Sequence, residues 1–342
     1  MSPNIAVLGA GVIGLTTAQV IQEWIPESRV TVIADQFLND IVSIGAAAYF
    51  RPEPTSGQDF NQTKQWSEAT YNFFLKLLND PNCDKIGIKM ITGYHVSNID
   101  LCVCQNSLLE QLLTDMSQLS PHQLKSLFPV EYKFGYTYTT VVTDPRYYLP
   151  YLMRKVTENG ATILQRKIEC LKNDPFLDNF HVVVNCTGLG AKRLCSDYKM
   201  VPIRGQTIKV KAPWIRNFYL NDGAYIVPGM DGLVTLGGIK QYGDWNPNIS
   251  SHDKEYILKR CLEIVPSLEK AEICWEWTGL RPYRSTVNVS KEIMGKGSRL
   301  RKVVHNYGHG GHGYALSRGT GEEAACLVKE LIGQSFNLKS HM

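Results

Sequence analysis

The sequence lacks the long apolar runs, basic clusters and signal segment that mark several classes of protein. Its apolar runs are shorter than the ~18–20 residues that a membrane-spanning helix needs, so no membrane protein is expected. The formal net charge of +4 is spread along the chain without a helix-turn-helix or zinc-finger pattern, which argues against a nucleic-acid partner. The N-terminus shows no secretory signal peptide. These absences predict a soluble intracellular protein.

The cysteines also lack a recognisable pattern. There are nine, and none has the CxxC…CxxC or mixed Cys/His spacing of a structural zinc site. Cys102 and Cys104 are separated by one residue, and the others are scattered. We therefore expect no metal and free, mostly buried thiols in a reducing compartment.

The chain contains no internal repeat, low-complexity tract or flexible linker. Its 342 residues, 44% of them apolar, can bury one large core or two modest ones, and the length favours about two domains. Without a linker, we expect these two domains to be interleaved in sequence.

The N-terminal stretch IAVLGAGVIGLTTA, residues 5–18, is typical of a nucleotide-binding turn. An apolar strand runs into Gly9, Gly11 and Gly14, and a helix from Val12 to about Trp24 follows. Glycines at this spacing let the backbone turn tightly and approach a pyrophosphate at the helix N-terminus.

A second strand, 29–34, ends at Asp35, about 20 residues past the last glycine. An acidic side chain at that distance fits a hydrogen bond to an adenosine ribose hydroxyl. The strand, turn, helix, strand and acid together predict a dinucleotide-binding βαβ unit.

The remaining pattern alternates between helical and strand segments. Helices are expected over 63–78, 107–127, 146–158, 253–265 and about 319–331. Strands are expected over 88–96, 134–142, 162–168, 181–185, 303–305 and, as an antiparallel set with turns at 221–223 and 228–229, over 203–238.

A second glycine-rich turn, YGHGGHG at 307–313, lies near the other end of the chain and precedes a helix. Two such turns predict a large cofactor held from two sides, whereas nicotinamide enzymes commonly need only the first. The helix dipole fits the electron-rich edge of a reduced flavin. His305, His309 and His312 lie in this turn or beside it, and its glycine context argues against a metal site.

The chain resembles the D-amino-acid oxidase and D-aspartate oxidase flavoenzymes over nearly its whole length. The matching segments are GAGVIG (9–14), VNCTGLGA (184–191), PIRGQ (202–206), APW (212–214), TLGG (235–238), GLRP (279–282) and HNYGHGG (305–311). This resemblance implies an α/β fold in which a Rossmann-type FAD-binding domain is interleaved with an α+β substrate domain built on an antiparallel sheet. The expected FAD-binding segments are 1–55, 140–200 and 300–340, and the expected substrate segments are 56–139 and 201–299.

The resemblance also implies an activity: oxidative deamination of a D-amino acid by non-covalent FAD and molecular oxygen, giving a 2-oxo acid, ammonia and hydrogen peroxide. Arg281 corresponds to the carboxylate-binding arginine, and Tyr225 to a tyrosine that contacts the same carboxylate. Gly311 falls where a backbone carbonyl accepts from the substrate amine. Hydride can then pass directly from the α-carbon to flavin N5, without a side-chain base.

The resemblance assigns cofactor contacts along the whole chain. Val42 and Ala315 depart from the family pattern, because each lacks a hydroxyl that the family carries. The implied FAD-binding residues are Gly9, Ala10, Gly11, Val12, Ile13, Gly14, Asp35, Gln36, Val42, Ser43, Ala47, Ala48, Tyr49, Ile168, Thr187, Gly188, Arg281, Gly308, Gly310, Gly311, Gly313, Tyr314 and Ala315.

Substrate choice is predicted from two cations and a short lid. Lys240 follows TLGG, where the aspartate-oxidising branch carries a basic residue, and Arg51 is placed near the same pocket. The lid, 220–225, lacks the extra tyrosine of the neutral-substrate branch; it also lacks the lid arginine of mammalian-type aspartate oxidases. These features favour D-aspartate and D-glutamate.

Three alternatives stay open from sequence: an oxidase of neutral D-amino acids, a flavin- or dinucleotide-binding protein without turnover, and a dehydrogenase. Ser340-His341-Met342 resembles a peroxisomal address read by an import receptor, so we expect a peroxisomal protein, with the cytosol as the alternative. The oligomeric state is not predicted.

Overall fold

Strand β1 (Asn4–Leu8) lies inside a parallel sheet, as its unbroken apolar run predicts. It pairs in parallel with β2 (Arg29–Ala34) on one side and with β7 (Val182–Asn185) on the other. Strand β14 (Arg301–His309) extends this sheet beyond β7, and β6 (Thr162–Gln165) extends it beyond β2. Segments from three distant parts of the sequence therefore build one nucleotide-binding type of sheet. The computed structural model describes residues 2–295 and 300–339, with side chains up to residue 333 in the last helix.

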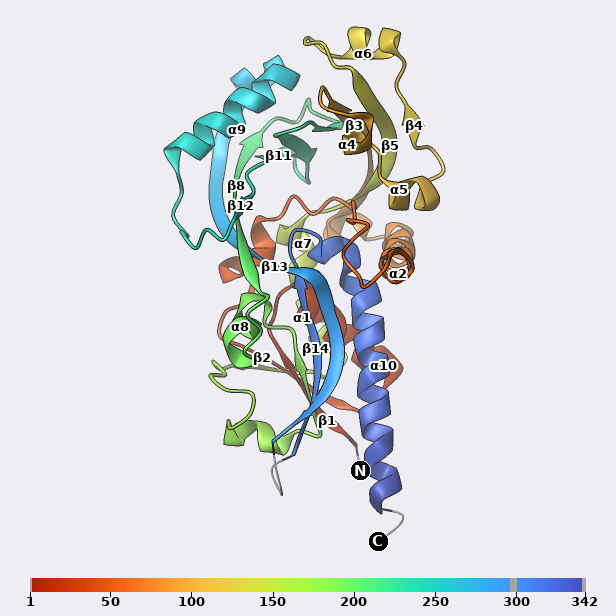
Figure 1. Cartoon of the computed structure of the whole chain (residues 1–342), viewed down its shortest axis with the longest axis vertical. Coiled ribbons are helices and arrows are strands. Elements are labelled where there is room, and N and C mark those ends of the chain that lie inside the picture. Colours follow the sequence, from red (N-terminus) through yellow and green to blue (C-terminus); the bar gives the residue numbers. More distant parts are fainter. Residues whose placement is uncertain (1, 296–299, 340–342) are drawn as a thin grey trace.

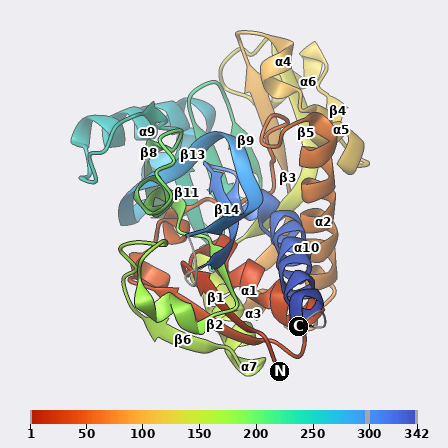
Figure 2. The same cartoon turned by 60° about the horizontal axis from the view of Figure 1, so that its bottom comes forward.

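Helices and short turns surround this parallel sheet. They are α1 (Val12–Trp24), η1 (Leu38–Asp40), η2 (Val42–Gly45), α7 (Pro145–Glu158), η3 (Pro175–Asn179), η4 (Gly188–Gly190), α8 (Ala191–Leu194) and α10 (Gly313–Lys339). Helix α10 packs against α1 and also against α2 (Phe60–Leu78), and Figures 1 and 2 show α10 and α2 side by side.

The other part of the molecule is built mainly on antiparallel strands. These are β3 (Ile88–Ser97), β4 (Ser117–Gln118), β5 (Phe134–Thr143), β8 (Val201–Lys211), β9 (Phe218–Leu220), β10 (Tyr225–Pro228), β11 (Leu233–Gly237), β12 (Gln241–Tyr242) and β13 (Glu272–Met294). Its helices are α3 (Cys83–Ile86), α4 (Leu101–Cys104), α5 (Ser107–Leu112), α6 (Pro121–Leu127), α9 (Ser251–Ile264) and η5 (Pro266–Lys270).

The two parts share one 14-stranded sheet. The path runs from β8 through β13 to β14, so the long strand β13 joins the antiparallel region to the parallel one. Figure 1 shows the two parts one above the other, with β8 and β13 passing between them. The predicted α/β class with an antiparallel substrate region is confirmed, while the exact domain boundaries stay predictions.

Several predicted elements need correction. The helix expected over 107–127 is instead α5, a short strand and α6, because Leu113 is extended and Pro121 starts a new helix behind a Ser120 capping box. The strand expected over 162–168 ends at Gln165, so Ile168 lies in a loop. Helix α10 begins at Gly313, directly after the glycine turn.

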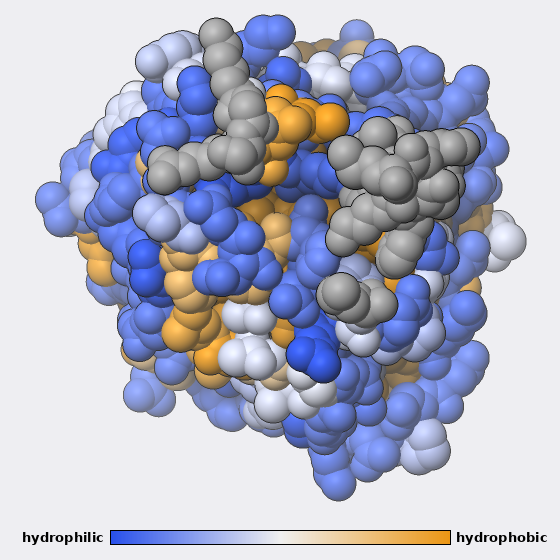
Figure 3. Space-filling model, turned by 90° about the horizontal axis from the view of Figure 1, so that it is seen from below, coloured by the Kyte–Doolittle hydropathy of each residue, from blue (hydrophilic) through white to orange (hydrophobic). Residues whose placement is uncertain are grey.

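The cysteines are free, and only Cys104, Cys186 and Cys261 are buried, which corrects the expectation of mostly buried thiols. Among the described residues, no helix is both long and apolar enough to span a bilayer. Figure 3 shows that the face seen from below is mostly hydrophilic, with hydrophobic residues gathered in and beside a central hollow. The tripeptide Ser340-His341-Met342 lies outside the described residues.

Candidate active site

A cavity of about 910 Å³ lies where the parallel and antiparallel regions meet. Both glycine-rich turns, the lid and the first residues of α1 and α10 line it. Of the residues predicted to hold the cofactor or the substrate, all except Gly14 line this cavity. The structure therefore brings the predicted residues together, although their individual roles stay predictions.

Gly14 acts on the shape of the turn. A Cβ at this position would lie 1.9 Å from the carbonyl oxygen of Gly9, so only glycine lets helix α1 approach the strand end this closely. Gly9 itself has φ +102°, and its N–H donates to the Ile33 carbonyl at 2.8 Å. Both glycines fix the backbone that other residues use to contact a ligand.

The N-terminus of α1 fits an anionic group. Gly11 caps the helix without a side-chain hydrogen bond, no acidic residue lies in the first turn, and the Val12 N–H donates to Ser43 Oγ at 3.2 Å. The N-terminus of α10, at Gly313, also faces the cavity and has no acid in its first turn. Two helix N-termini directed into one cavity match a phosphate group and an electron-rich ring.

The far end of the cavity fits an adenosine group. Asp35 and Gln36 follow β2 and line this end together with Ile168. Nearby, the Asn185 Oδ1 accepts hydrogen bonds from Thr187 N at 3.2 Å and Thr187 Oγ1 at 2.7 Å, which holds the bend before Gly188. The cavity thus offers an adenosine end, an anion site and a second glycine cradle, which are the parts that FAD requires.

Two residues predicted to contact the cofactor, Tyr314 and Tyr49, do more than line the cavity. Tyr314 Oη donates to the Ser43 carbonyl at 3.0 Å, so it ties α10 to η2. Tyr49 lies where the charges of Arg51 and Arg281 act on it, and its partial burial raises the pKa of its hydroxyl. Tyr49 thus lies near the substrate end of the cavity.

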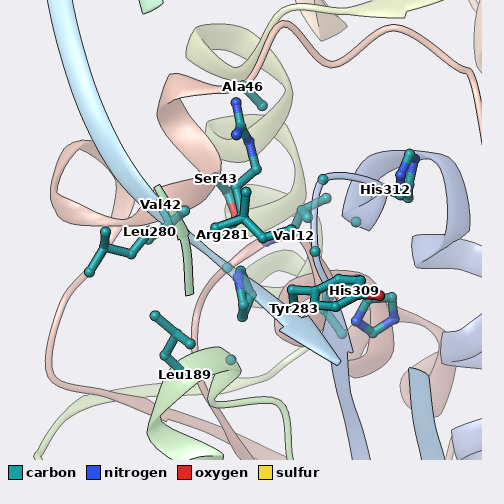
Figure 4. A pocket seen from close by; sticks show the side chains of 18 of the residues that line it. Val12, Val42, Ser43, Ala46, Leu189, Leu280, Arg281, Tyr283, His309 and His312 are labelled. Carbon is teal, nitrogen blue, oxygen red and sulfur yellow. The ribbon is translucent and has the colours of Figure 1, made fainter. Parts of the chain in front are cut away.

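Arg281 and Tyr225 meet at the substrate end. Arg281 is on β13 opposite Ile203, and its Nη1 donates to the Ile239 carbonyl at 3.0 Å. Burial raises the pKa of Tyr225, and the neighbouring Arg281 guanidinium opposes that rise. Gly311 lies next to the Arg281 side chain, since a Cβ at Gly311 would lie 3.7 Å from Arg281 Cδ. Figure 4 shows Arg281 and Tyr283 of β13 around one pocket with Ser43.

Arg51 enters the same end of the cavity from a firmly anchored backbone. The Phe50 N–H donates to the Val141 carbonyl at 2.7 Å, and His312 Nδ1 lies 3.2 Å from the Arg51 carbonyl. The Arg51 Nε is buried without a hydrogen-bond partner among the described residues. The Arg51 guanidinium forms no salt bridge to any residue within 2–295 or 300–339. Tyr138 lies beside this guanidinium.

Positive charge accumulates around this end of the cavity. Desolvation by the cavity wall and the charges of Arg51 and Arg281 lower the pKa of the Lys240 ammonium, although this residue keeps contact with solvent. Burial, together with the Arg51 charge, lowers the pKa of His95 to about 3. Glu53, which is exposed, is the acid whose negative charge opposes the fall in the Lys240 pKa.

Several residues at this end were not predicted from the sequence. His95, His312, Glu53 and Tyr283 line the cavity, and so does Trp277, whose indole lies against Gly279. These residues come from separate elements, and no local motif marks them. The three histidines around the glycine turn have different partners: His305 contacts Glu292 Oε1 at 2.8 Å, His309 contacts Thr320 Oγ1 at 3.1 Å, and His312 contacts Arg51.

The buried histidines predict how stability depends on pH. Burial lowers the pKa of His95 and His309 to about 3, and partial burial lowers that of His312 to about 4, all below the ~6.5 of an unfolded histidine. The unfolded chain therefore binds more protons as pH falls below about 6.5, and the free energy of unfolding decreases from there toward pH 4. Each histidine adds a slope of about 1.4 kcal/mol per pH unit inside that window.

Urea unfolding at pH 7.0, 6.0 and 5.0 measures this slope. His95→Gln should make it shallower, whereas His122→Gln, at an exposed position, should leave it unchanged. An equal slope in wild type and His95→Gln would show that His95 does not become protonated on unfolding.

The sequence matches the model of the DAO family, described as FAD dependent oxidoreductase, over residues 4–327. The chain belongs to this family. It is 36% identical to D-aspartate oxidase of Homo sapiens, covering 96% of this chain and 95% of that protein. It is also 31% identical to a D-amino acid oxidase of Dugesia ryukyuensis, covering 96% and 98%.

As a DAO family member, the protein is an FAD-dependent oxidoreductase, and its cavity fits the cofactor. The fold agrees with a solved glycine oxidase from Bacillus cereus, at a TM-score of 0.78 with 18% identity over 96% of this chain and 95% of that one. Family membership fixes the cofactor and the class of reaction. The substrate depends on the other side chains of the cavity.

Proposed function

We propose that this protein oxidises acidic D-amino acids, D-aspartate and D-glutamate, to 2-oxo acids with release of ammonia and hydrogen peroxide. One observation carries the proposal: Arg51 and Lys240 line the cavity that holds Arg281 and Tyr225, and neither forms a salt bridge within the described part of the chain. The similarity to Homo sapiens D-aspartate oxidase supports the same substrate class.

Arg281 and Tyr225 are suited to bind the α-carboxylate. One Arg281 nitrogen donates to Ile239, and the other N–H groups of its planar head can donate to two carboxylate oxygens. The raised pKa of Tyr225 keeps its phenol protonated at neutral pH, so its O–H can donate as well. These contacts fix the α-carbon between the two sides of the cavity.

The amine must be neutral for oxidation, and the cavity favours that form. The positive charges of Arg51, Lys240 and Arg281 disfavour a nearby ammonium. The Gly311 carbonyl can then accept a hydrogen bond from the amine. When bound, FAD supplies the two-electron acceptor for the α-C–H bond. No side-chain base is needed in this scheme.

The side-chain carboxylate of an acidic substrate is assigned to Arg51 and Lys240. Each charged hydrogen bond contributes about 1.5–3 kcal/mol when it forms away from water. Asp222, the lid acid, forms no ion pair with Arg51 or Lys240 in the described part of the chain; its Oδ1 accepts from Ser97 Oγ at 2.5 Å and its Oδ2 accepts from Asn98 N at 3.1 Å. An uncharged substrate side chain would leave the partly buried Arg51 guanidinium and the exposed Lys240 ammonium without a counter-charge.

A panel of D-amino acids with a peroxide readout tests the proposal. Yellow holoenzyme should release peroxide with D-aspartate or D-glutamate at a kcat/KM well above that with D-alanine or D-proline. Preference for D-alanine or D-proline would identify a neutral D-amino-acid oxidase instead. Holoenzyme without peroxide release would identify a flavin-binding protein without turnover.

The double variant Arg51→Ala/Lys240→Ala should lose most of its preference for acidic substrates. We expect kcat/KM for D-aspartate to fall about a hundredfold, because two charged hydrogen bonds are removed, while that for D-alanine is nearly unchanged. Arg154→Ala/Lys155→Ala on the exposed face of α7 is the matched control, since it removes one arginine and one lysine that do not line the cavity. An unchanged D-aspartate to D-alanine ratio in the first variant would contradict the assignment.

Release of peroxide also supports our proposal of a peroxisomal location through Ser340-His341-Met342. A fluorescent protein fused to the N-terminus leaves this tripeptide free and should colocalise with peroxisomes. Deleting the tripeptide should move the fusion to the cytosol, and an unchanged distribution would contradict the address.

A further inference from the structure

The strands beneath Arg281 and Tyr225 carry glycines at two positions where any other residue would place its side chain against these two groups. Gly205 lies inside β8 and Gly237 is the last residue of β11, and both are paired with neighbouring antiparallel strands. Glycine weakens a strand interior because it leaves more backbone freedom in the unfolded chain and has no side chain to pack. Its presence at these positions therefore calls for a local reason.

The strand register shows how each glycine faces its partner. Gly205 pairs with Gly279 of β13, so Arg281, two residues further along β13, is its diagonal neighbour on the same face. Gly237 pairs directly with Tyr225 of β10. Each functional side chain can therefore fold back over the α-carbon of a glycine.

The distances show that both groups lie on the glycine backbone. A Cβ at Gly205 would lie 2.4 Å from Cζ, Nη1 and Nη2 of Arg281 alike, so the guanidinium plane lies flat over this residue. A Cβ at Gly237 would lie 2.3 Å from Cζ and 2.4 Å from Oη of Tyr225. All of these distances are far below van der Waals contact.

We propose that Gly205 and Gly237 are positioning residues that set the depth at which Arg281 and Tyr225 bind the substrate carboxylate. This inference rests on the proposed function, in which those two groups hold the α-carboxylate. Any side chain at either glycine lifts the guanidinium or the phenol off the sheet. The lifted group then enters the volume that the carboxylate occupies, and the Arg281 bond to the Ile239 carbonyl is strained.

Alanine at these positions should displace the functional group without unfolding the strand. The atoms that the new methyl group meets are the tips of flexible side chains, which can move. At Gly9 and Gly14, by contrast, a Cβ would meet backbone oxygens at 2.5 and 1.9 Å, which cannot move without shifting the fold. Gly205→Ala and Gly237→Ala therefore test position at little expense to stability.

The first experiment compares holoenzymes of wild type, Gly205→Ala, Gly237→Ala and Gly333→Ala. At Gly333 a Cβ meets nothing within 4 Å, so this variant controls for the glycine-to-alanine change itself. We expect KM for D-aspartate to rise about tenfold or more in the first two variants, with a smaller change in kcat. Calorimetric titration with malonate and with propionate, which lack the amine that is oxidised, should show the same loss of affinity.

A double-mutant cycle separates positioning from general damage to the strand. Lysine at position 281 has no planar head to lie over Gly205. If Gly205 acts by positioning the guanidinium, Gly205→Ala should weaken malonate binding about tenfold with Arg281 and less than about threefold in the Arg281→Lys background. Equal losses in both backgrounds would show a merely structural role and overturn the proposal.

The outcomes also separate this inference from the proposed function. Normal D-aspartate kinetics and normal malonate affinity in Gly205→Ala and Gly237→Ala would overturn the inference and leave the function intact. A wild type that binds propionate but does not oxidise acidic substrates would contradict the proposed function. The propionate affinities of wild type, Gly205→Ala and Gly237→Ala would then decide whether the two glycines position Arg281 and Tyr225. A wild type that binds neither carboxylate would overturn both.

Discussion

Arg281→Lys should lower kcat/KM for D-aspartate by about a hundredfold or more, mainly through KM. A lysine ammonium is a point charge that cannot form two parallel hydrogen bonds to a carboxylate. Arg281 also donates to the Ile239 carbonyl at 3.0 Å, and one ammonium cannot serve that oxygen and both carboxylate oxygens in the same geometry. Losing one charged hydrogen bond and misplacing another removes about 3 kcal/mol or more of binding.

Steady-state kinetics with D-aspartate and calorimetry with malonate measure this loss. Arg154→Lys, on the exposed face of α7, is the control for the chemical change and should be silent. A variant with nearly normal KM would show that Arg281 is not the carboxylate ligand. Retained FAD in Arg281→Lys, read from its absorption spectrum, shows that the loss arises at the substrate end.

The N-terminal βαβ unit could be predicted almost to the residue. Helix α1 (Val12–Trp24) and strand β2 (Arg29–Ala34) have the bounds expected from sequence. Local chemistry determines these elements, because glycines at fixed spacing force the turn and two apolar runs favour buried parallel strands. The glycine turn before α10 was predicted for the same reason, although that helix starts at Gly313.

Strand β13 (Glu272–Met294) was not predicted. Most of its residues are partly buried on both faces, so it lacks the alternation of buried and exposed side chains that identifies a strand. Its 23 residues are held by pairing with β8 and β14, which are distant in sequence. Arg281 was found from its motif, whereas the strand that carries it depends on tertiary context.

The substrate end of the cavity was predicted only in part. Arg51 and Lys240 were assigned to it, but His95 and His312 were not, since their approach depends on how β3 and the glycine turn pack around Arg51. Likewise, GLRP and TLGG are visible motifs, yet the placement of Arg281 over Gly205 follows only from strand register. Sequence identified the chemical groups, and the fold determines their mutual distances.

Asp253→Ala should lower the free energy of unfolding by about 3–5 kcal/mol, the usual effect of leaving a buried charge without its partner. Arg204 is 1% exposed and Asp253 is 5% exposed, and Arg204 Nη1 donates to Asp253 Oδ2 at 2.5 Å. The same guanidinium donates to the carbonyls of Asn246 at 2.9 Å and Asn248 at 2.7 Å. Without Asp253, Arg204 keeps the two carbonyls and the exposed carboxylate of Asp244, whose Oδ2 lies 3.9 Å from Arg204 Nε, but loses its buried counter-charge.

The effect should extend to substrate binding, because Arg204 Nη1 also donates to Gln241 Oε1 at 2.6 Å, directly beside Lys240. Urea unfolding of the holoenzyme measures the stability, and Glu68→Ala is the control, since it removes an exposed partner of Lys64 and should change stability by less than about 0.5 kcal/mol. Asp253→Asn, which keeps the acceptor without the charge, should fall between the two. A loss below about 1 kcal/mol in Asp253→Ala would mean that Asp244 and the carbonyls of Asn246 and Asn248 suffice to hold the Arg204 charge.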